Sequence, residues 1–239
     1  MRTISERNSE KRSRFLMRTA KEIRNYTVRK KISVALLSML TLVTALLYVV
    51  ATLYKQSGSF TVSIDKYDMT KYGLSLSETR DMAQKTATLN AKIDEEITNI
   101  AGEWIPEDVD MIDGEHNGDD YIAYTFYLEN SGSVEVPVEY EIGISNITNG
   151  LDEAIRIRLY RDGEATTYAK TKNDGSGPEE GTTEFYSDKL AMRDRIENFN
   201  PGQTMKFTVV IWVEGNDPEC VDWLIGGKLR VDMNMSIIH

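Results

Sequence analysis

Seven oxygen-bearing side chains lie within thirteen residues near the middle of the chain: Asp108, Asp110, Asp113, Glu115, Asn117, Asp119 and Asp120. Carboxylate and amide oxygens on a short loop are the ligands that Ca²⁺ prefers in proteins. The sequence therefore offers one candidate metal centre, a Ca²⁺ site in this acidic loop, and no other cofactor is expected.

The spacing of these residues leaves a second interpretation open. The EF-hand loop places Asp or Asn at its first, third and fifth positions before a Gly at the sixth. With Gly114 at the sixth position, those places hold Val109, Met111 and Asp113, so the pattern does not match. The alternative is a solvated loop in which Asp, Asn and Gly form turns and caps.

Other catalytic patterns are absent from the sequence. It contains two histidines, His116 and His239, and neither belongs to an HExxH zinc motif. GxSxG, phosphate-loop and GxGxxG motifs are also missing. Cys220 is the single cysteine, so an internal disulfide is excluded. We expect it to be a small, buried apolar residue. We therefore expect no enzymatic activity.

An apolar segment, residues 33–54, separates two parts of opposite charge. As a helix its 22 residues would span ~33 Å, close to the ~30 Å hydrocarbon core of a bilayer. The segment predicts an uncleaved signal-anchor helix. A cleaved signal peptide, with Val49-Val50-Ala51 near the cut, and a soluble core helix are the alternatives.

Charge predicts the orientation. Residues 1–32 carry 11 Lys/Arg and 3 Asp/Glu, whereas the remainder carries 17 and 35. The basic side of a membrane span stays in the cytoplasm, so residues 1–32 form a basic cytoplasmic segment and residues 55–239 an extracellular domain. The acidic domain disfavours nucleic acid as a partner. The leader itself is either an amphipathic helix on the membrane surface or a disordered basic tail.

The sequence on both sides of the acidic loop predicts β-strands. Alternation with period two recurs between turn residues, which predicts a mainly β domain, an antiparallel β-sandwich of the immunoglobulin-like or jelly-roll kind. The clearest strands are expected at 60–64, 73–77, 86–93, 121–128, 134–144, 155–159, 165–170, 205–213 and 228–238.

Finer expectations follow from single residues. Asn130-Ser131-Gly132 predicts a hairpin between 121–128 and 134–144, and Pro137 predicts a free edge on the second strand. Residues 189–199 suggest helical turns. Asp217-Pro218 suggests a helix start, and Trp212 and Trp223 are expected in the core.

The stretches DVDMIDGEHNGDDYIAYTFYLENSG, LDEAIRIRLYRDGEATTYAK and VVIWVEGNDPECVDWLIGGKLRVDMNM resemble a group of uncharacterised, membrane-exported proteins of Gram-positive bacteria. More distantly, the order of an apolar export segment and a β-sandwich resembles the TasA/camelysin class. That resemblance implies fibre or matrix formation at the cell surface.

These observations predict a membrane-anchored extracellular protein with a structural, adhesive or surface-assembly role. Its expected partners are the lipid membrane and cell-surface proteins or further copies of itself. The alternatives are a Ca²⁺-dependent ligand-binding module that uses the acidic loop, and a secreted fibre subunit if the apolar segment is cleaved.

Overall fold

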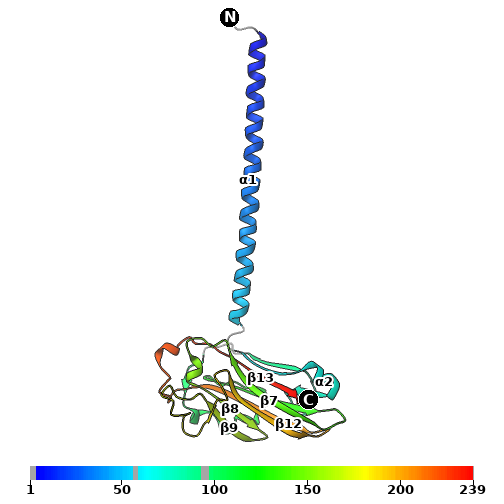
Figure 1. The fold of residues 1–239 in the computed structure, drawn as a ribbon, viewed down its shortest axis with the longest axis vertical. Coiled ribbons are helices and arrows are strands. Elements are labelled where there is room, and N and C mark those ends of the chain that lie inside the picture. The colour runs from blue at the N-terminus through cyan, green and yellow to red at the C-terminus, as the bar shows by residue number, and fades with distance from the viewer. Residues whose placement is uncertain (1–3, 56–58, 93–96, 239) are drawn as a thin grey trace. The chain divides into compact units, whose positions relative to one another are not determined.

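The computed structural model describes residues 4–55, 59–92 and 97–238 (Figure 1). It divides into two compact units, Met1–Lys55 and Gln56–His239. The first unit is one helix, α1 (Ile4–Lys55). The leader from Ile4 and the apolar segment therefore form one continuous helix. That the leader lies on a membrane surface stays a prediction. Within α1, Ile23–Val49 is long and apolar enough to cross a membrane, and none of that window is buried by protein.

Serine and threonine do not interrupt the apolar part of α1, because their hydroxyls bond back to the helix. Thr44 Oγ1 donates to the Leu40 carbonyl over 3.0 Å, and Ser38 Oγ donates to the Ala35 carbonyl over 2.9 Å. Such bonds satisfy a hydroxyl without water. A lipid environment therefore tolerates these residues.

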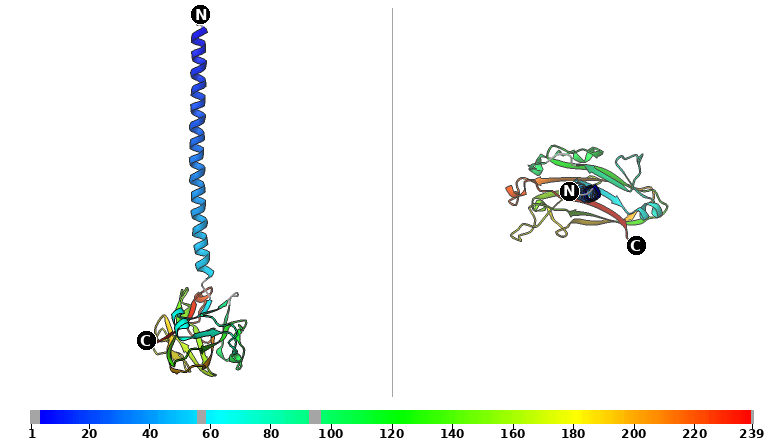
Figure 2. Two further views of the ribbon diagram at one scale, coloured as in Figure 1. Left: turned by 90° about the vertical axis from the view of Figure 1, so that its right-hand side faces the viewer. Right: turned by 90° about the horizontal axis from the view of Figure 1, so that it is seen from above.

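The second unit is mainly β and consists of two packed sheets, so the sandwich expected from the sequence is confirmed (Figure 2). One sheet has five strands in the order β11 (Leu190–Phe199), β7 (Val136–Ser145), β13 (Arg230–Ile237), β1 (Ser59–Ile64) and β3 (Thr88–Lys92). The expected strand near 86–93 is therefore present, although positions 93–96 lie outside the described residues.

The other sheet has eight strands. Its main path runs β10 (Thr183–Glu184), β9 (Glu164–Ala169), β8 (Ile155–Arg161), β12 (Thr204–Glu214), β6 (Tyr121–Asn130) and β2 (Leu74–Ser77). β4 (Asn99–Ile100) joins the end of β12, and β5 (Gly114–Glu115) joins β6. Short helices fill the connections: α2 (Lys66–Tyr72), η1 (Gly102–Trp104), η2 (Val109–Met111), η3 (Leu151–Glu153) and η4 (Asp222–Leu224).

Most neighbouring strands are antiparallel, as expected, but both sheets are mixed. β1 runs parallel to β13, with Phe60 opposite Val231 and Ile64 opposite Met235. β9–β10 and β12–β4 are the other parallel pairs among the described strands. The β1–β13 pairing places the start of the domain beside the start of its last strand.

Aromatic side chains from both sheets form the centre of the core. Phe207 of β12 stacks on Phe126 of β6, with ring centroids 5.5 Å apart. Across the sandwich, the same ring meets Tyr140 of β7 at 5.3 Å. All three are almost completely buried. These contacts join the two inner faces, as expected for sheets that pack about 10 Å apart.

The hairpin expected between 121–128 and 134–144 is wrong. β6 pairs with β12 and β2 in one sheet, whereas β7 pairs with β11 and β13 in the other. The turn between them instead carries the chain across the sandwich. Buried Asn130 holds this crossing: its Nδ2 donates to the carbonyls of Val134 (3.0 Å) and Phe199 (2.8 Å), and its Oδ1 accepts from Gly132 N (3.0 Å).

Gly132 is required at that crossing because a Cβ there would collide with the Tyr72 carbonyl. The free edge expected at Pro137 is also wrong, since β7 is paired on both sides. β11 accommodates the proline by a register shift between Ile196 and Phe199, opposite the position that lacks an N–H. The helical turns expected over 189–199 are wrong as well, because this segment is strand β11.

Candidate functional site

The acidic loop spreads its carboxylates among protein partners. Asp110 is buried. Lys206 Nζ donates to Asp110 Oδ2 at 3.1 Å and to the backbone carbonyl of Asp110 at 2.8 Å. Asp113 accepts from the Tyr127 hydroxyl at 2.6 Å. These two side chains therefore stabilise the packing of the loop on β12 and β6.

Asp120 bonds to a different segment. Its Oδ1 accepts from Thr98 Oγ1 at 2.6 Å and from Thr98 N at 2.9 Å. The hydroxyl bond first, and the backbone bond second, lower the pKa of this carboxyl. Asp120 thus joins the loop to the residue that immediately precedes β4.

The remaining members of the loop act locally. Asn117 Nδ2 donates to Glu115 Oε1 at 2.8 Å, and Asn117 Oδ1 accepts from Ala123 N at 3.0 Å. Asp108 starts η2 through its carbonyl, and Asp119 is exposed. His116 is held between the carbonyls of Gly114 and Val109, at 2.9 and 2.7 Å from its two ring nitrogens.

A different group of carboxylates is brought together elsewhere. Among the described residues, the one group of three acidic, His or Cys side chains whose ligand atoms all lie within 4.8 Å of one another is Glu179, Asp217 and Glu219. None of the seven residues predicted from the sequence belongs to this group. The Ca²⁺ site in the acidic loop stays a prediction; in five of its seven residues one side-chain oxygen accepts from a protein donor.

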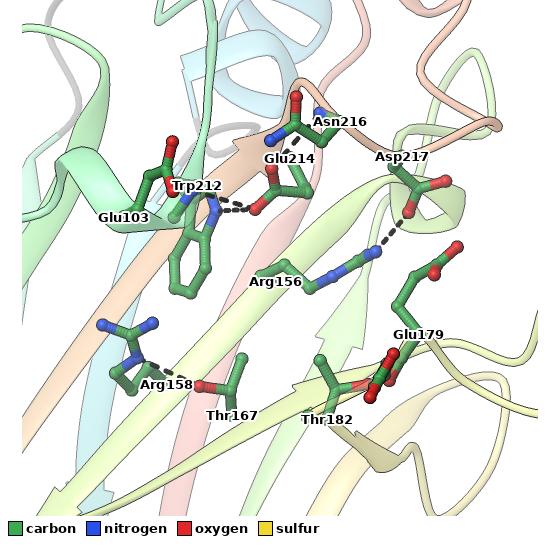
Figure 3. A pocket seen from close by; sticks show the side chains of 13 residues that line it. Glu103, Arg156, Arg158, Thr167, Glu179, Thr182, Trp212, Glu214, Asn216 and Asp217 are labelled. Atoms are coloured by element: carbon green, nitrogen blue, oxygen red, sulfur yellow. Dashed lines mark hydrogen bonds and ion pairs between the residues drawn. The ribbon is translucent and has the colours of Figure 1, made fainter.

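The carboxylate group lies at one side of an open cleft of about 370 Å³ (Figure 3). β8 and β12 form its floor with Arg156, Arg158 and Trp212. Most of the walls come from residues 179–182, which connect β9 to β10, and from the end of β12 and the turn after it, which supply Glu214, Asn216 and Asp217. Arg156 and Arg158 share a face because alternate residues of a strand point to the same side.

A buried ion pair occupies one side of the cleft. Arg156 and Asp217 are 2% and 3% exposed in their side chains, and Arg156 Nη2 donates to Asp217 Oδ2. Arg156 Nη1 also donates to the Ile155 carbonyl at 3.1 Å. Asp217 Oδ1 accepts from Glu219 N at 2.8 Å. Both charges are therefore paired and further hydrogen-bonded, which is the condition for burying them.

The other side of the cleft is organised by Glu214. Its Oε2 accepts from Trp212 Nε1 at 2.9 Å and from Gly102 N at 3.0 Å. Arg158 lies over the indole ring of Trp212, 4.9 Å from its centroid, and its Nε donates to Thr167 Oγ1 at 3.0 Å. Figure 3 shows the outer nitrogens of Arg158 pointing away from Thr167.

The close carboxylates perturb one another. A hydrogen bond with Asp217 raises the pKa of Glu219 above its ordinary value. Burial acts to raise the pKa of Asp217, but bonds from Glu219 and Arg156 outweigh it and the pKa is lowered. Glu179 Oε2 lies 3.2 Å from Lys172 Nζ, while its buried Oε1 has no hydrogen-bond partner among the described residues.

Charge restricts what the cleft can bind. Its lining contains five carboxylates, on Glu103, Glu179, Glu180, Glu214 and Asp217, against the guanidinium groups of Arg156 and Arg158. The excess of negative charge repels anions. It suits a hard cation or a basic or hydroxyl-rich group of a larger molecule.

Three sequence expectations near the cleft are revised. The helix expected to start at Asp217-Pro218 is absent. Asp217 Oδ1 instead accepts from Glu219 N within a turn, and the next helix, η4, begins at Asp222. Trp212 is buried as expected, whereas Trp223 is 58% exposed and is not a core residue. Cys220 is half-buried and packs on Ala154, Val213 and Leu224; burial raises the pKa of its thiol.

The sequence showed the alternation of Ile155-Arg156-Ile157-Arg158 but did not indicate that Arg156 is buried. An outward-facing Arg is usually solvated. Here the segment around Asp217, 61 residues further along the chain, covers it. The one sequence feature that could have indicated this cleft was the presence of two arginines, Arg156 and Arg158, on one face of a predicted strand.

No family model and no curated protein matches the chain. Among solved structures it is similar to AvmM, which catalyses macrocyclization in alchivemycin A biosynthesis, with 10% identity and a TM-score of 0.22 over 41% of this chain and 58% of that one. A β-glucosidase from Kluyveromyces marxianus in complex with glucose matches at 11% identity and a TM-score of 0.23, over 75% of this chain and 17% of that one. The chain thus spans less than two thirds of either protein, and these likenesses carry no functional argument.

Proposed function

We propose that the chain is a single-pass membrane protein whose β-sandwich lies outside the cell and has a structural, adhesive or surface-assembly role. The observation that carries the proposal is the bare apolar part of α1: an 18-residue window within Ile23–Val49 has a mean hydropathy of 2.3 and no burial by protein. Such a surface is costly in water at roughly 25 cal/mol per Å². A bilayer would remove that cost.

The charge pattern supports the orientation. Six basic residues stand before or at the start of the apolar segment, namely Arg18, Lys21, Arg24, Arg29, Lys30 and Lys31, and Lys55 alone closely follows it. Because the basic flank stays in the cytoplasm, the N-terminus is cytoplasmic and the sandwich extracellular.

The chemistry of the cleft favours a structural or adhesive role over catalysis. Arg156 and Asp217 neutralise each other, and Glu214 accepts from two donors. Groups held in this way stabilise the walls of a recognition surface. Its carboxylates would favour basic or hydroxyl-rich cell-surface material.

The edge strand β11 supports self-association or binding of a surface protein. It is ten residues long and lies at the end of the five-stranded sheet. Its charged residues Arg193, Asp194, Arg195 and Glu197, together with two register shifts, discourage indiscriminate strand addition. A partner would have to match this pattern, which favours specific assembly.

Labelling with a membrane-impermeant thiol reagent tests location and orientation. In a Cys220→Ser background, Ser176→Cys places a thiol on an exposed turn of the sandwich, and Ser9→Cys places one on the exposed leader. Intact cells should label the first variant alone, and lysed cells should label both. Labelling of Ser9→Cys in intact cells would reverse the proposed orientation.

The role itself is tested with the full-length chain in detergent. We expect concentration-dependent association in sedimentation, or binding to isolated cell-envelope material. A protein that stays monomeric at high concentration and binds no envelope fraction would refute the structural role while leaving the anchor intact.

Two alternatives have their own tests. Mass spectrometry of the mature protein distinguishes a tethered chain that retains Met1 from a secreted fibre subunit that begins near Lys55. Calorimetric titration addresses the Ca²⁺-dependent module. Absence of heat with millimolar Ca²⁺ would remove it.

A further inference from the structure

An apolar loop protrudes between β12 and β13. Val221, Trp223 and Ile225 are 42%, 58% and 76% exposed, and they flank or belong to η4. Between them, Leu224 is only 5% exposed and packs on Ala154 and Val213. The loop is therefore fixed to the core by one side chain while it presents three others to the surroundings.

Hydrogen bonds hold the loop in this form. Ile225 N donates to the Asp222 carbonyl at 3.2 Å, and Gly227 N donates to the Leu224 carbonyl at 2.8 Å. From the opposite side, Asn149 Nδ2 donates to the Ile225 carbonyl at 3.0 Å. The exposure of the apolar side chains is thus built into an ordered backbone.

Trp223 has a specific seat. Its ring lies against Gly150, where a Cβ would collide with the indole and where φ is +61°. Glycine is favoured at such a backbone conformation. The contact leaves more than half of the indole exposed and sets its direction.

The strand register places this loop at one known end of the domain. β1 and β13 run parallel with Phe60 opposite Val231, so the loop that leads into β13 lies at the end where β1 begins. Arg230 faces Ser145, which brings the end of β7 to the same place. Figure 1 shows the loop in orange at the beginning of β13.

That end is the one attached to α1. Three residues separate Lys55, the last residue of α1, from Ser59, the first of β1. Whatever the angle between the two parts, these steps allow at most about 14 Å from Lys55 to Ser59. If α1 crosses a bilayer, the start of β1 stays near the headgroup layer.

We propose that Val221, Trp223 and Ile225 rest in the headgroup region of the bilayer that α1 crosses, as a second contact of the extracellular domain with lipid. This inference rests on the membrane anchoring proposed above. Indole, with an apolar body and an N–H, is suited to the boundary between lipid and water. Exposed Asp222 limits the contact to the headgroup level, because a carboxylate is costly in hydrocarbon.

Tryptophan fluorescence tests the proposal in the full-length chain. The protein contains three tryptophans, and Trp212 is 1% exposed. In a Trp104→Phe background, Trp223 is therefore the one exposed indole. The chain is reconstituted into phosphatidylcholine vesicles with either ordinary or brominated acyl chains, and incorporation is measured by flotation.

We expect brominated lipid to reduce the emission of the Trp104→Phe protein. The same protein carrying Trp223→Phe should lose that lipid-dependent reduction, and one carrying Ile225→Asp should show less of it. Urea unfolding of each variant verifies that the sandwich is folded. Gly150→Ala, which displaces the indole from its seat, should also weaken the quenching.

The outcomes separate the two proposals. Flotation with equal Trp223 emission in both lipids would overturn the lipid contact and leave the anchor standing. Shielding of Trp223 from an aqueous quencher without quenching by brominated lipid would also overturn it, and would indicate a second copy or another protein on the loop. Failure to float would overturn the anchor and the lipid contact together.

Discussion

The acidic loop and the cleft around Arg156 use similar side chains in opposite ways. In residues 108–120 the carboxylates are close in sequence, yet they bond to partners in different segments, as Asp110 bonds Lys206 and Asp120 bonds Thr98. In the cleft, Glu179 and Asp217 come from distant segments and approach one another. A high density of acidic residues along the sequence therefore does not show that their carboxylates come together in the folded chain.

The largest expected effect concerns the ion pair of the cleft. Arg156→Met leaves Asp217 buried without its cation, which should lower the free energy of unfolding by about 3–5 kcal/mol. Urea unfolding measures the change. Arg195→Met is the matched control, because Arg195 and Glu197 are both 59% exposed and such pairs contribute about 0–1 kcal/mol. Equal losses of unfolding free energy in the two variants would contradict the stabilising role of the buried Arg156–Asp217 pair.

A smaller loss is expected in the acidic loop. Asp110→Asn removes the charge that Lys206 Nζ contacts at 3.1 Å, and should lower the free energy of unfolding by about 1.5 kcal/mol. If the loop is held by its protein partners, the loss will be the same in chelator and in excess Ca²⁺. A loss that appears only with Ca²⁺ would instead support the metal site.

Tyr127 refines the description of the loop. Burial first, and its hydrogen bond to Asp113 second, raise the pKa of this phenol to about 12. A folded-state pKa above the ordinary value of about 10 stabilises the fold fully below pH 10, and this stabilisation is lost as the pH rises through 12. Asp113→Asn should lower the phenol's pKa without restoring the ordinary value, as phenolate absorbance would show. An unchanged titration would contradict the bond.

The smallest expected effect is the pH dependence of Glu219. Its pKa is raised by the bond with Asp217, so it stabilises the fold below its ordinary pKa of 4.5 and this contribution is lost as the pH rises through the folded-state value. Glu219→Gln should remove this dependence in urea unfolding across acidic pH. Glu180→Gln, a change in an exposed residue of the same cleft, should preserve it.

The sequence predicted those features that depend on local pattern. Alternation with period two indicated most strands, among them β8 and β9. In the structure Asp162 and Gly163 join these two strands as a hairpin, and both residues adopt a positive φ. Length and uniform apolarity likewise indicated the helix later seen as part of α1.

Features that depend on long-range contacts were missed. The same local pattern at Asn130 fits a hairpin or a crossing between sheets, and the crossing is accompanied by long-range contacts such as the bond from Asn130 to Phe199. The cleft is formed by segments that meet only in the folded chain, so the sequence pattern around Arg156 does not reveal that its side chain is buried. Trp223 was expected in the core because apolar residues surround it in the sequence, and this local pattern does not show which of them face outward.

Protease treatment of intact cells tests the central claim, the partition of the chain across a membrane, most directly. The account predicts that added protease removes the sandwich from intact cells, while residues of the leader stay protected. If the sandwich survives on intact cells but is cleaved in lysates under the same conditions, it does not face outward and the account is contradicted.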